Sequence, residues 1–129
     1  MSQTQTEDMA PLVLVVDDVE TARVLTEIVL TNAEFRVVQA ENGKEALEVY
    51  CEQRPDIVLL DVSMPVINGY QICKAIKSYP KTRNVPVVML SGNDGFFDKV
   101  KGRMAGAETY LTKPCEPATL LRTIRELLH

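Results

Sequence analysis

The chain has 129 residues, of which 46% are hydrophobic and 25% are charged, and its formal net charge at pH 7 is −4. This length predicts one domain that can bury a core without disulfides or metals. A mildly acidic chain lacks the basic stripe of a protein that binds the phosphate backbone, so no nucleic-acid partner is expected. No apolar run reaches the length of a transmembrane helix, so membrane insertion is not expected.

The amino terminus differs in composition from the rest of the chain. Residues 1–8 are polar and contain no Lys or Arg, which is not typical of a signal peptide. We therefore expect residues 1–10 to form a short disordered lead, and residues 11–129 to form the single domain.

The three cysteines, Cys51, Cys73 and Cys115, are odd in number and match no metal-binding spacing. Reduced thiols in a cytoplasmic protein are the expectation. Cys51 and Cys73 fall on the apolar stripes of predicted helices, where Cys behaves as a small core residue, so both are predicted to be buried.

Buried strands and amphipathic helices alternate along the first half of the chain. Continuous apolar or β-rich runs and helical periodicity predict strands at residues 12–16, 35–40 and 57–61 and helices at 19–32 and 43–53. Asn32 can end the first helix in the left-handed conformation. Asn42 precedes Glu45 by three residues, which indicates a capping pair at the start of the second helix.

The same alternation continues in the second half. Strands are predicted at residues 85–90 and 109–112, and helices at 70–79, 96–104 and from 117 onward. Pro86 is tolerated near the beginning of its strand. Pro117 suits the first turn of the final helix.

Five strand–helix units in strict alternation predict an α/β fold with helices on both faces of a parallel sheet. Five strands in this length fit a doubly wound, flavodoxin-like sheet with strand order 2-1-3-4-5 and five helices. The topological switch point then lies between the first and third strands, where such folds bind ligands at the carboxyl ends.

Chemically distinctive side chains follow four of the five strands: Asp17, Asp18, Asp61, Ser91 and Lys113. In a parallel sheet these positions share one edge, so three carboxylates are expected to crowd together there. Carboxylates at such short range need a cation. Oxygen ligands favour Mg²⁺. With a lysine and a hydroxyl nearby, the set describes transfer of a phosphoryl group onto a carboxylate.

The residues at these strand ends, together with Met64-Pro65, Asn68-Gly69, Tyr110 and Lys113-Pro114, resemble a receiver domain of bacterial two-component signalling, of the chemotaxis-regulator type. The resemblance covers the chain after its amino-terminal lead. Within residues 89–103 the sequence is also similar to regulators of twitching motility and phototaxis.

The resemblance implies a role for each site residue. Asp61 would accept a phosphoryl group from a phosphohistidine of a sensor histidine kinase or phosphotransfer protein. Asp18 and Asp61 would ligate Mg²⁺, with Asp17 acting through a water and the backbone carbonyl of Ser63 completing the protein ligands. The protein would be a signalling phosphoacceptor that catalyses only its own phosphorylation and dephosphorylation.

The resemblance also implies a switch. Lys113 would pair with Asp61 and then with the phosphoryl group, and Ser91 would bond a phosphoryl oxygen. Tyr110 would turn inward and reshape the face made by the fourth predicted helix, the fifth strand and the fifth helix. The Lys113-Pro114 bond is expected to be cis. We expect a stand-alone receiver, monomeric or weakly dimeric, that acts on an effector protein.

Three alternatives remain. A hydrolase with an aspartyl nucleophile, of the haloacid-dehalogenase type, needs a second acid two residues after the nucleophile, where this chain has Ser63. A flavin-binding flavodoxin relative needs a phosphate loop where Asp17 and Asp18 stand. The third alternative is a receiver fold that signals without phosphorylation. The departures from the common receiver pattern, Gly92 in place of Ala and Cys115 in place of Phe, remove no chemical group.

Overall fold

The computed structural model describes residues 10–62, 69–78, 80, 82–92, 103 and 105–128. Its elements are β1 (Leu12–Val16), α2 (Glu20–Asn32), β2 (Arg36–Ala40), α3 (Gly43–Gln53), β3 (Ile57–Asp61), α4 (Gly69–Ser78), β4 (Val87–Ser91), β5 (Thr109–Thr112) and α6 (Pro117–Leu127). All five predicted strands are present. Pro117 occupies the first turn of α6, as predicted.

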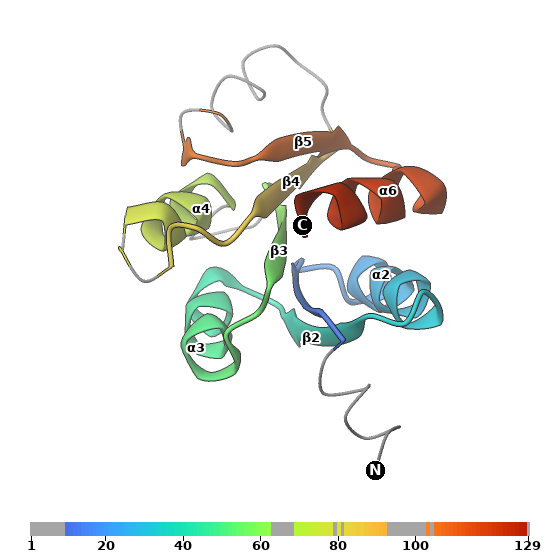
Figure 1. The fold of residues 1–129 in the computed structure, drawn as a ribbon, viewed down its shortest axis with the longest axis horizontal. Helices are drawn as coiled ribbons and strands as arrows, with labels where there is room; N and C mark the ends of the chain where they lie inside the picture. The colour runs from blue at the N-terminus through green and yellow to red at the C-terminus, as the bar shows by residue number, and fades with distance from the viewer. Residues whose placement is uncertain are drawn as a thin grey trace.

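The five strands form one parallel sheet in the order β2-β1-β3-β4-β5, which confirms the predicted topology (Figure 1). The order reverses between β1 and β3, which lie side by side although a whole strand–helix unit separates them in the sequence. Among the described residues the sheet carries four helices instead of the predicted five. The predicted helix at residues 96–104 lies almost entirely outside the described residues.

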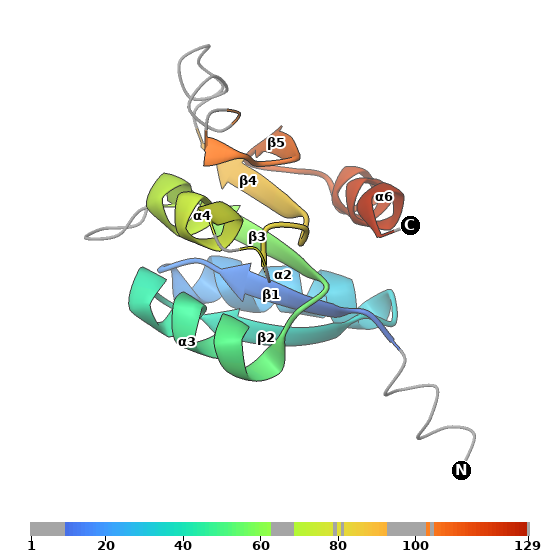
Figure 2. The same cartoon turned by 60° about the vertical axis from the view of Figure 1, so that its left-hand side comes forward.

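Successive residues along each strand enter two separate cores, one on each face of the sheet. On one face α3 and α4 pack over a first cluster, and on the other α2 and α6 pack over a second (Figures 1 and 2). In β3, for example, Val58 and Leu60 join the first cluster and Ile57 and Leu59 join the second. Burial on both faces explains why the central strands read as continuous apolar runs.

The predicted cap of α3 is present, whereas the predicted end of α2 is wrong. Asn42 Oδ1 accepts a hydrogen bond from the Glu45 N–H at 2.8 Å. Asn32 is still helical, and the left-handed residue is Glu34, with φ of 71°. The reversal falls there because the next residue, Phe35, enters the core, and its N–H donates to the carbonyl of Leu30.

Two further expectations need correction. Cys51 is exposed, because α3 buries the face that carries Ala46 and Tyr50, while Cys73 is buried as predicted. The fourth strand begins at Val87, two residues later than predicted, because the N–H of Val85 bonds to the carbonyl of Thr82 in a turn. Within the described residues, no helix is both long enough and apolar enough to span a membrane.

Candidate functional site

The carboxyl edge of the sheet gathers the predicted acidic residues. In the register of the sheet Val16 pairs with Leu60, so Asp17 and Asp61 follow at equivalent positions on neighbouring strands. One carboxylate oxygen each from Asp17, Asp18 and Asp61 lies within 4.8 Å of the others. Asp17 and Asp61 are each 5% exposed, whereas Asp18 is open to solvent.

Lys113 provides a positive charge beside this cluster. Its Nζ lies 3.0 Å from Oδ2 of Asp17 and 3.6 Å from Oδ2 of Asp61. The Lys113 N–H donates to the carbonyl of Ser91 at 2.6 Å, which fixes the lysine backbone to the end of β4. The bond between Lys113 and Pro114 is cis, as predicted. The loop after β5 therefore brings the ammonium group to the two buried carboxylates.

The donor set fits a divalent cation. The cluster has three carboxylates, and the ammonium of Lys113 pairs with two of them, so negative charge remains in excess at an edge where two of the acids are buried. Carboxylate oxygens with one side open to water are the surroundings that Mg²⁺ prefers. Asp17, Asp18 and Asp61 are therefore the described residues that can hold Mg²⁺.

Of the other predicted site residues, Ser91 lies at the same end of the sheet, Tyr110 lies within a strand, and Ser63 is not described. Ser91 ends β4 and is 2% exposed. Tyr110 lies in β5, is half-buried and packs against the core under α3 and α4. Ser63 lies outside the described residues, as do residues 64–68.

Gly69 contributes to the site in a way that sequence reasoning missed. A β-carbon on Gly69 would lie 2.6 Å from the carbonyl oxygen of Asp61 and 2.9 Å from Cα of Val62. The pair Asn68-Gly69 signals a turn in the sequence, but nothing in it reveals that the start of α4 touches the backbone of Asp61. Arg23, which bonds to the carbonyl of Asp17, was missed for the same reason.

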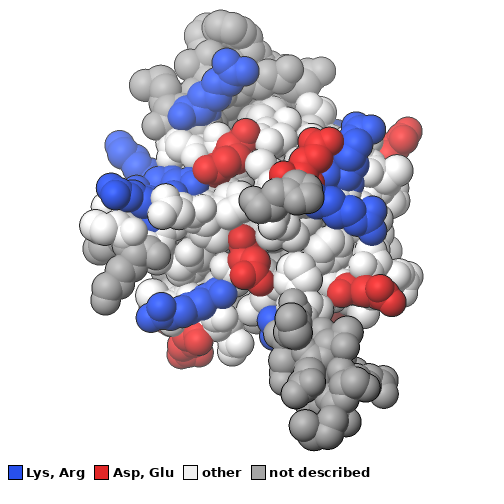
Figure 3. All heavy atoms as spheres, viewed as in Figure 1, with Lys and Arg blue, Asp and Glu red and all other residues white. Residues whose placement is uncertain are grey.

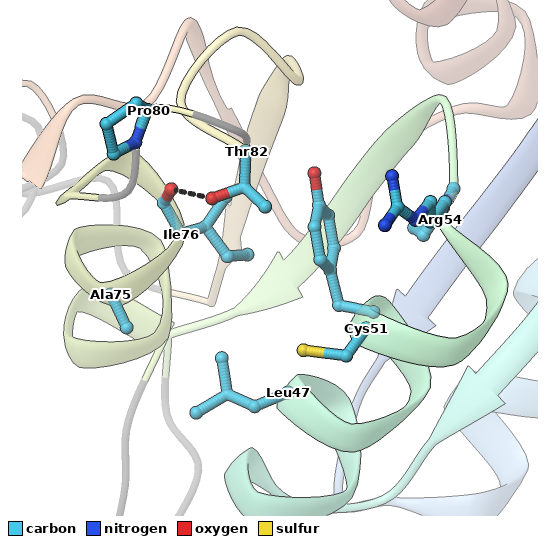
Figure 4. Close-up of a pocket in the computed structure, with 9 residues that line it drawn as sticks. Leu47, Cys51, Arg54, Ala75, Ile76, Pro80 and Thr82 are labelled. Atoms are coloured by element: carbon cyan, nitrogen blue, oxygen red, sulfur yellow. Dashed lines mark hydrogen bonds between the residues drawn. The ribbon is translucent and has the colours of Figure 1, made fainter.

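A separate hollow of about 840 Å³ lies between α3 and α4. Leu47 and Cys51 on α3 face Ala75 and Ile76 on α4 (Figure 4), and the described residues that line the hollow include none of the predicted site residues. On the face viewed in Figure 3, acidic and basic side chains are interspersed, in keeping with the small net charge.

Known proteins place the chain in a family. A family model described as "Response regulator receiver domain" matches residues 13–125. Protein PilG of Pseudomonas aeruginosa is 41% identical over 113 residues, covering 88% of this chain and 84% of PilG. Protein PilH of the same organism is 36% identical over 116 residues, which is 90% of this chain and 96% of PilH. The crystal structure of chemotaxis protein CheY4 of Vibrio cholerae has a TM-score of 0.88 and 34% identity, covering 92% of this chain and 99% of that one.

The chain belongs to the response regulator receiver family, the phosphoacceptor class of two-component systems. Its similarity to PilG, PilH and CheY4 matches the chemotaxis-regulator type expected from the sequence. Magnesium binding at an acidic site is general to this family, and the cluster of Asp17, Asp18 and Asp61 is of that kind. The boundaries of the domain at residues 11 and 129 stay a prediction.

Proposed function

We propose that this protein accepts a phosphoryl group on Asp61 from a phosphohistidine of a sensor kinase or phosphotransfer protein. The observation that carries the proposal is the position of Asp61 beside two further carboxylates, with the Lys113 ammonium 3.6 Å away. A carboxylate held between a cation-binding cluster and a lysine can act as a nucleophile toward phosphorus.

Three carboxylates and one backbone carbonyl would hold the magnesium ion. Asp18 and Asp61 are proposed as direct ligands, Asp17 as a ligand through a water, and Ser63 as the donor of the carbonyl. Bound magnesium supplies positive charge that offsets the charge of the phosphoryl oxygens. The exposure of Asp18 beside two buried acids supports a site that is open to solvent on one side.

In the transfer step an oxygen of Asp61 forms a bond to phosphorus while the bond from phosphorus to the donor imidazole breaks. The electron pair of that bond returns to the imidazole nitrogen. Lys113 exchanges its contact with Asp61 for one with a phosphoryl oxygen, and the Ser91 hydroxyl donates a hydrogen bond to another. Both side chains start from the carboxyl edge, which supports these roles.

The phosphorylated form is proposed to act by changing partner binding. Tyr110 would turn inward and reshape the expected face of the helix predicted at residues 96–104, β5 and α6, on which an effector protein would dock. A role in motility or phototaxis is supported by the similarity of residues 89–103 to regulators of those processes. The similarity to a protein named for chemotaxis also supports it. The exchange with a kinase would take place in the cytoplasm.

Intact mass after incubation with acetyl phosphate and Mg²⁺ tests the proposal. Wild type should gain one phosphoryl group that hydroxylamine removes, and Asp61→Asn should gain none. Asp56→Asn is the matched control, because Asp56 accepts the N–H of Leu12 at the opposite edge of the sheet. An adduct of equal yield in Asp61→Asn contradicts the assignment.

Wild type that binds Mg²⁺ but shows no adduct leaves two explanations, which beryllofluoride separates. A beryllofluoride complex that depends on Asp61 would indicate a short-lived phosphoaspartate. No complex would indicate a receiver fold that signals without phosphorylation.

A further inference from the structure

Arg23 joins the acidic edge of the sheet to β2. It lies in the first turns of α2 and is half-buried. Its Nη1 donates to the carbonyl oxygen of Asp17 at 2.8 Å, and its Nε donates to Oε1 of Gln39 at 2.7 Å. One planar guanidinium thus bridges the end of β1 and a side chain of the neighbouring strand.

The bond from Arg23 completes the fixation of Asp17. The N–H of Asp17 donates to the carbonyl of Ala40 at 3.2 Å. Its Oδ1 accepts from the N–H of Val19 at 2.9 Å, and its Oδ2 accepts from Lys113 at 3.0 Å. The remaining polar group of Asp17 is its carbonyl oxygen, which accepts the hydrogen bond from Arg23.

That carbonyl belongs to the peptide that links Asp17 to Asp18. A peptide unit is planar, so fixing its oxygen also fixes the direction in which the chain continues to Cα of Asp18. Asp18 is exposed and belongs to the three-carboxylate cluster. The hydrogen bond from Arg23 to this peptide therefore bears on where Asp18, the exposed acid of the cluster, begins.

Helix energetics do not explain an arginine at this position. Cations near a helix amino terminus are disfavoured by the helix dipole. A positive charge near a cation-binding cluster also opposes metal binding through Coulomb repulsion. Arg23 therefore conflicts with both local preferences, and such conflicts are expected at functional sites.

We propose that Arg23, itself held by Gln39, is a positioning residue that presents Asp17 and Asp18 to the divalent cation. The proposal rests on the magnesium site of the proposed function and adds a part to it. Groups that orient metal ligands from outside the coordination shell commonly change metal affinity by about 10- to 100-fold when they are mutated.

Calorimetric titration with MgCl₂ at constant ionic strength tests the role of Arg23. Loss of positioning should lower the Mg²⁺ affinity, whereas loss of the positive charge should raise it. Arg23→Met should weaken Mg²⁺ binding about tenfold if positioning dominates. Charge removal alone would tighten it. Arg23→Lys keeps the charge but cannot bridge Asp17 and Gln39, so it should weaken binding as well. Gln39→Leu, which removes one end of the bridge, should have a smaller effect in the same direction.

Arg36→Met is the matched control. Arg36 donates to the carbonyl of Ala10 at 2.8 Å at the other end of β2, so this change removes the same charge and a similar hydrogen bond. Its Mg²⁺ affinity should equal that of wild type. Thermal unfolding without Mg²⁺ establishes whether each variant is folded. If Arg23→Met does not fold, the Mg²⁺ affinities of Arg23→Lys and Gln39→Leu test the proposal in its place.

The phosphorylation rate separates positioning from direct participation. At saturating Mg²⁺ the rate of Arg23→Met with acetyl phosphate should return to that of wild type. Folded Arg23 variants that bind Mg²⁺ as tightly as wild type, or more tightly, overturn the inference alone. Wild type that binds no Mg²⁺ overturns the magnesium site of the proposed function and the inference with it.

Discussion

Gly69 touches the backbone of Asp61, so closely that a β-carbon on Gly69 would lie 2.6 Å from the Asp61 carbonyl oxygen. The first residue of α4 is thus packed against the end of the strand that carries the proposed phosphoacceptor. The start of α4 can pack this closely against the end of β3 only because glycine has no side chain.

Gly69→Ala should destabilise the fold and impair the site. The new methyl group overlaps with backbone atoms that cannot move aside separately, so a loss of about 1–3 kcal/mol in the free energy of unfolding is expected. Phosphorylation should slow, because the strand end that carries Asp61 is displaced. Gly92→Ala is the control: a β-carbon there meets nothing within 4 Å. Urea unfolding that ranks the two variants equally would contradict the close approach.

Lys113→Met should separate metal binding from phosphoryl transfer. Lys113 competes with the cation for Asp17 and Asp61, so its removal should tighten Mg²⁺ binding about tenfold. The same change removes a charge that would stabilise the transferred group, so phosphorylation should slow about 100-fold. Titration calorimetry and intact mass measure the two effects, and Lys74→Met, an exposed lysine of α4, is the control for lost charge. Weaker Mg²⁺ binding in Lys113→Met would count against the electrostatic account.

Lys77→Met should reduce stability without affecting the site. Lys77 Nζ donates to the carbonyls of Arg83 (3.0 Å) and Val85 (2.6 Å) and to Oε2 of Glu108 (2.7 Å), and its side chain is 13% exposed. Three acceptors lose their donor, so a loss of about 1–3 kcal/mol is expected. Because this cluster lies at the amino-terminal edge of the sheet, Mg²⁺ affinity should not change. Lys74→Met should unfold like wild type, and a double-mutant cycle with Glu108→Gln isolates the ion pair.

The three thiols should react in order of exposure. Cys51 is exposed, Cys115 is half-buried and Cys73 is buried. Burial raises the pKa of Cys73 to about 11, and burial together with the Glu116 carboxylate raises the pKa of Cys115. At pH 8 a thiol reagent should modify Cys51 first and Cys73 only on unfolding. Rapid labelling of native Cys73, read by peptide mass, would contradict its burial.

The raised pKa of Cys73 also predicts how stability changes in alkali. The folded protein favours the neutral thiol, so the stabilisation is complete below the pKa of the unfolded chain and is lost as pH rises towards 11. Cys73→Ala should remove this part of the pH dependence. If the free energies of unfolding of Cys73→Ala and wild type decrease in parallel between pH 9 and 11, this prediction is wrong.

The sequence predicted the strands, their order and the residues at the acidic edge for definite physical reasons. A parallel sheet buried on both faces leaves continuous apolar runs such as residues 57–60, and the residue that ends each run must lie at the common edge. The amino-acid pattern alone therefore places Asp17 and Asp61 side by side, and the sheet register bears this out.

Details that depend on tertiary contacts were not predictable in this way. The left-handed turn falls at Glu34 and not at Asn32, because the burial of Phe35 sets where the chain reverses. Cys51 shares helical spacing with core residues but lies at the edge of the buried stripe. Gly69 contacts the backbone of Asp61, and the side chain of Arg23 bonds to the backbone carbonyl of Asp17. No residue pattern in the sequence encodes either contact.

The ion pair between Lys113 and Asp17 joins residues 96 positions apart, and β5, which delivers the lysine, pairs in the described sheet only with β4 at its outer edge. A chain whose last strand has not docked can have the acidic cluster but not the cation beside it. The full rate of phosphoryl transfer should consequently appear during refolding only once β5 has docked. The rate at which refolding protein takes up label from acetyl phosphate would then report when β5 joins the sheet.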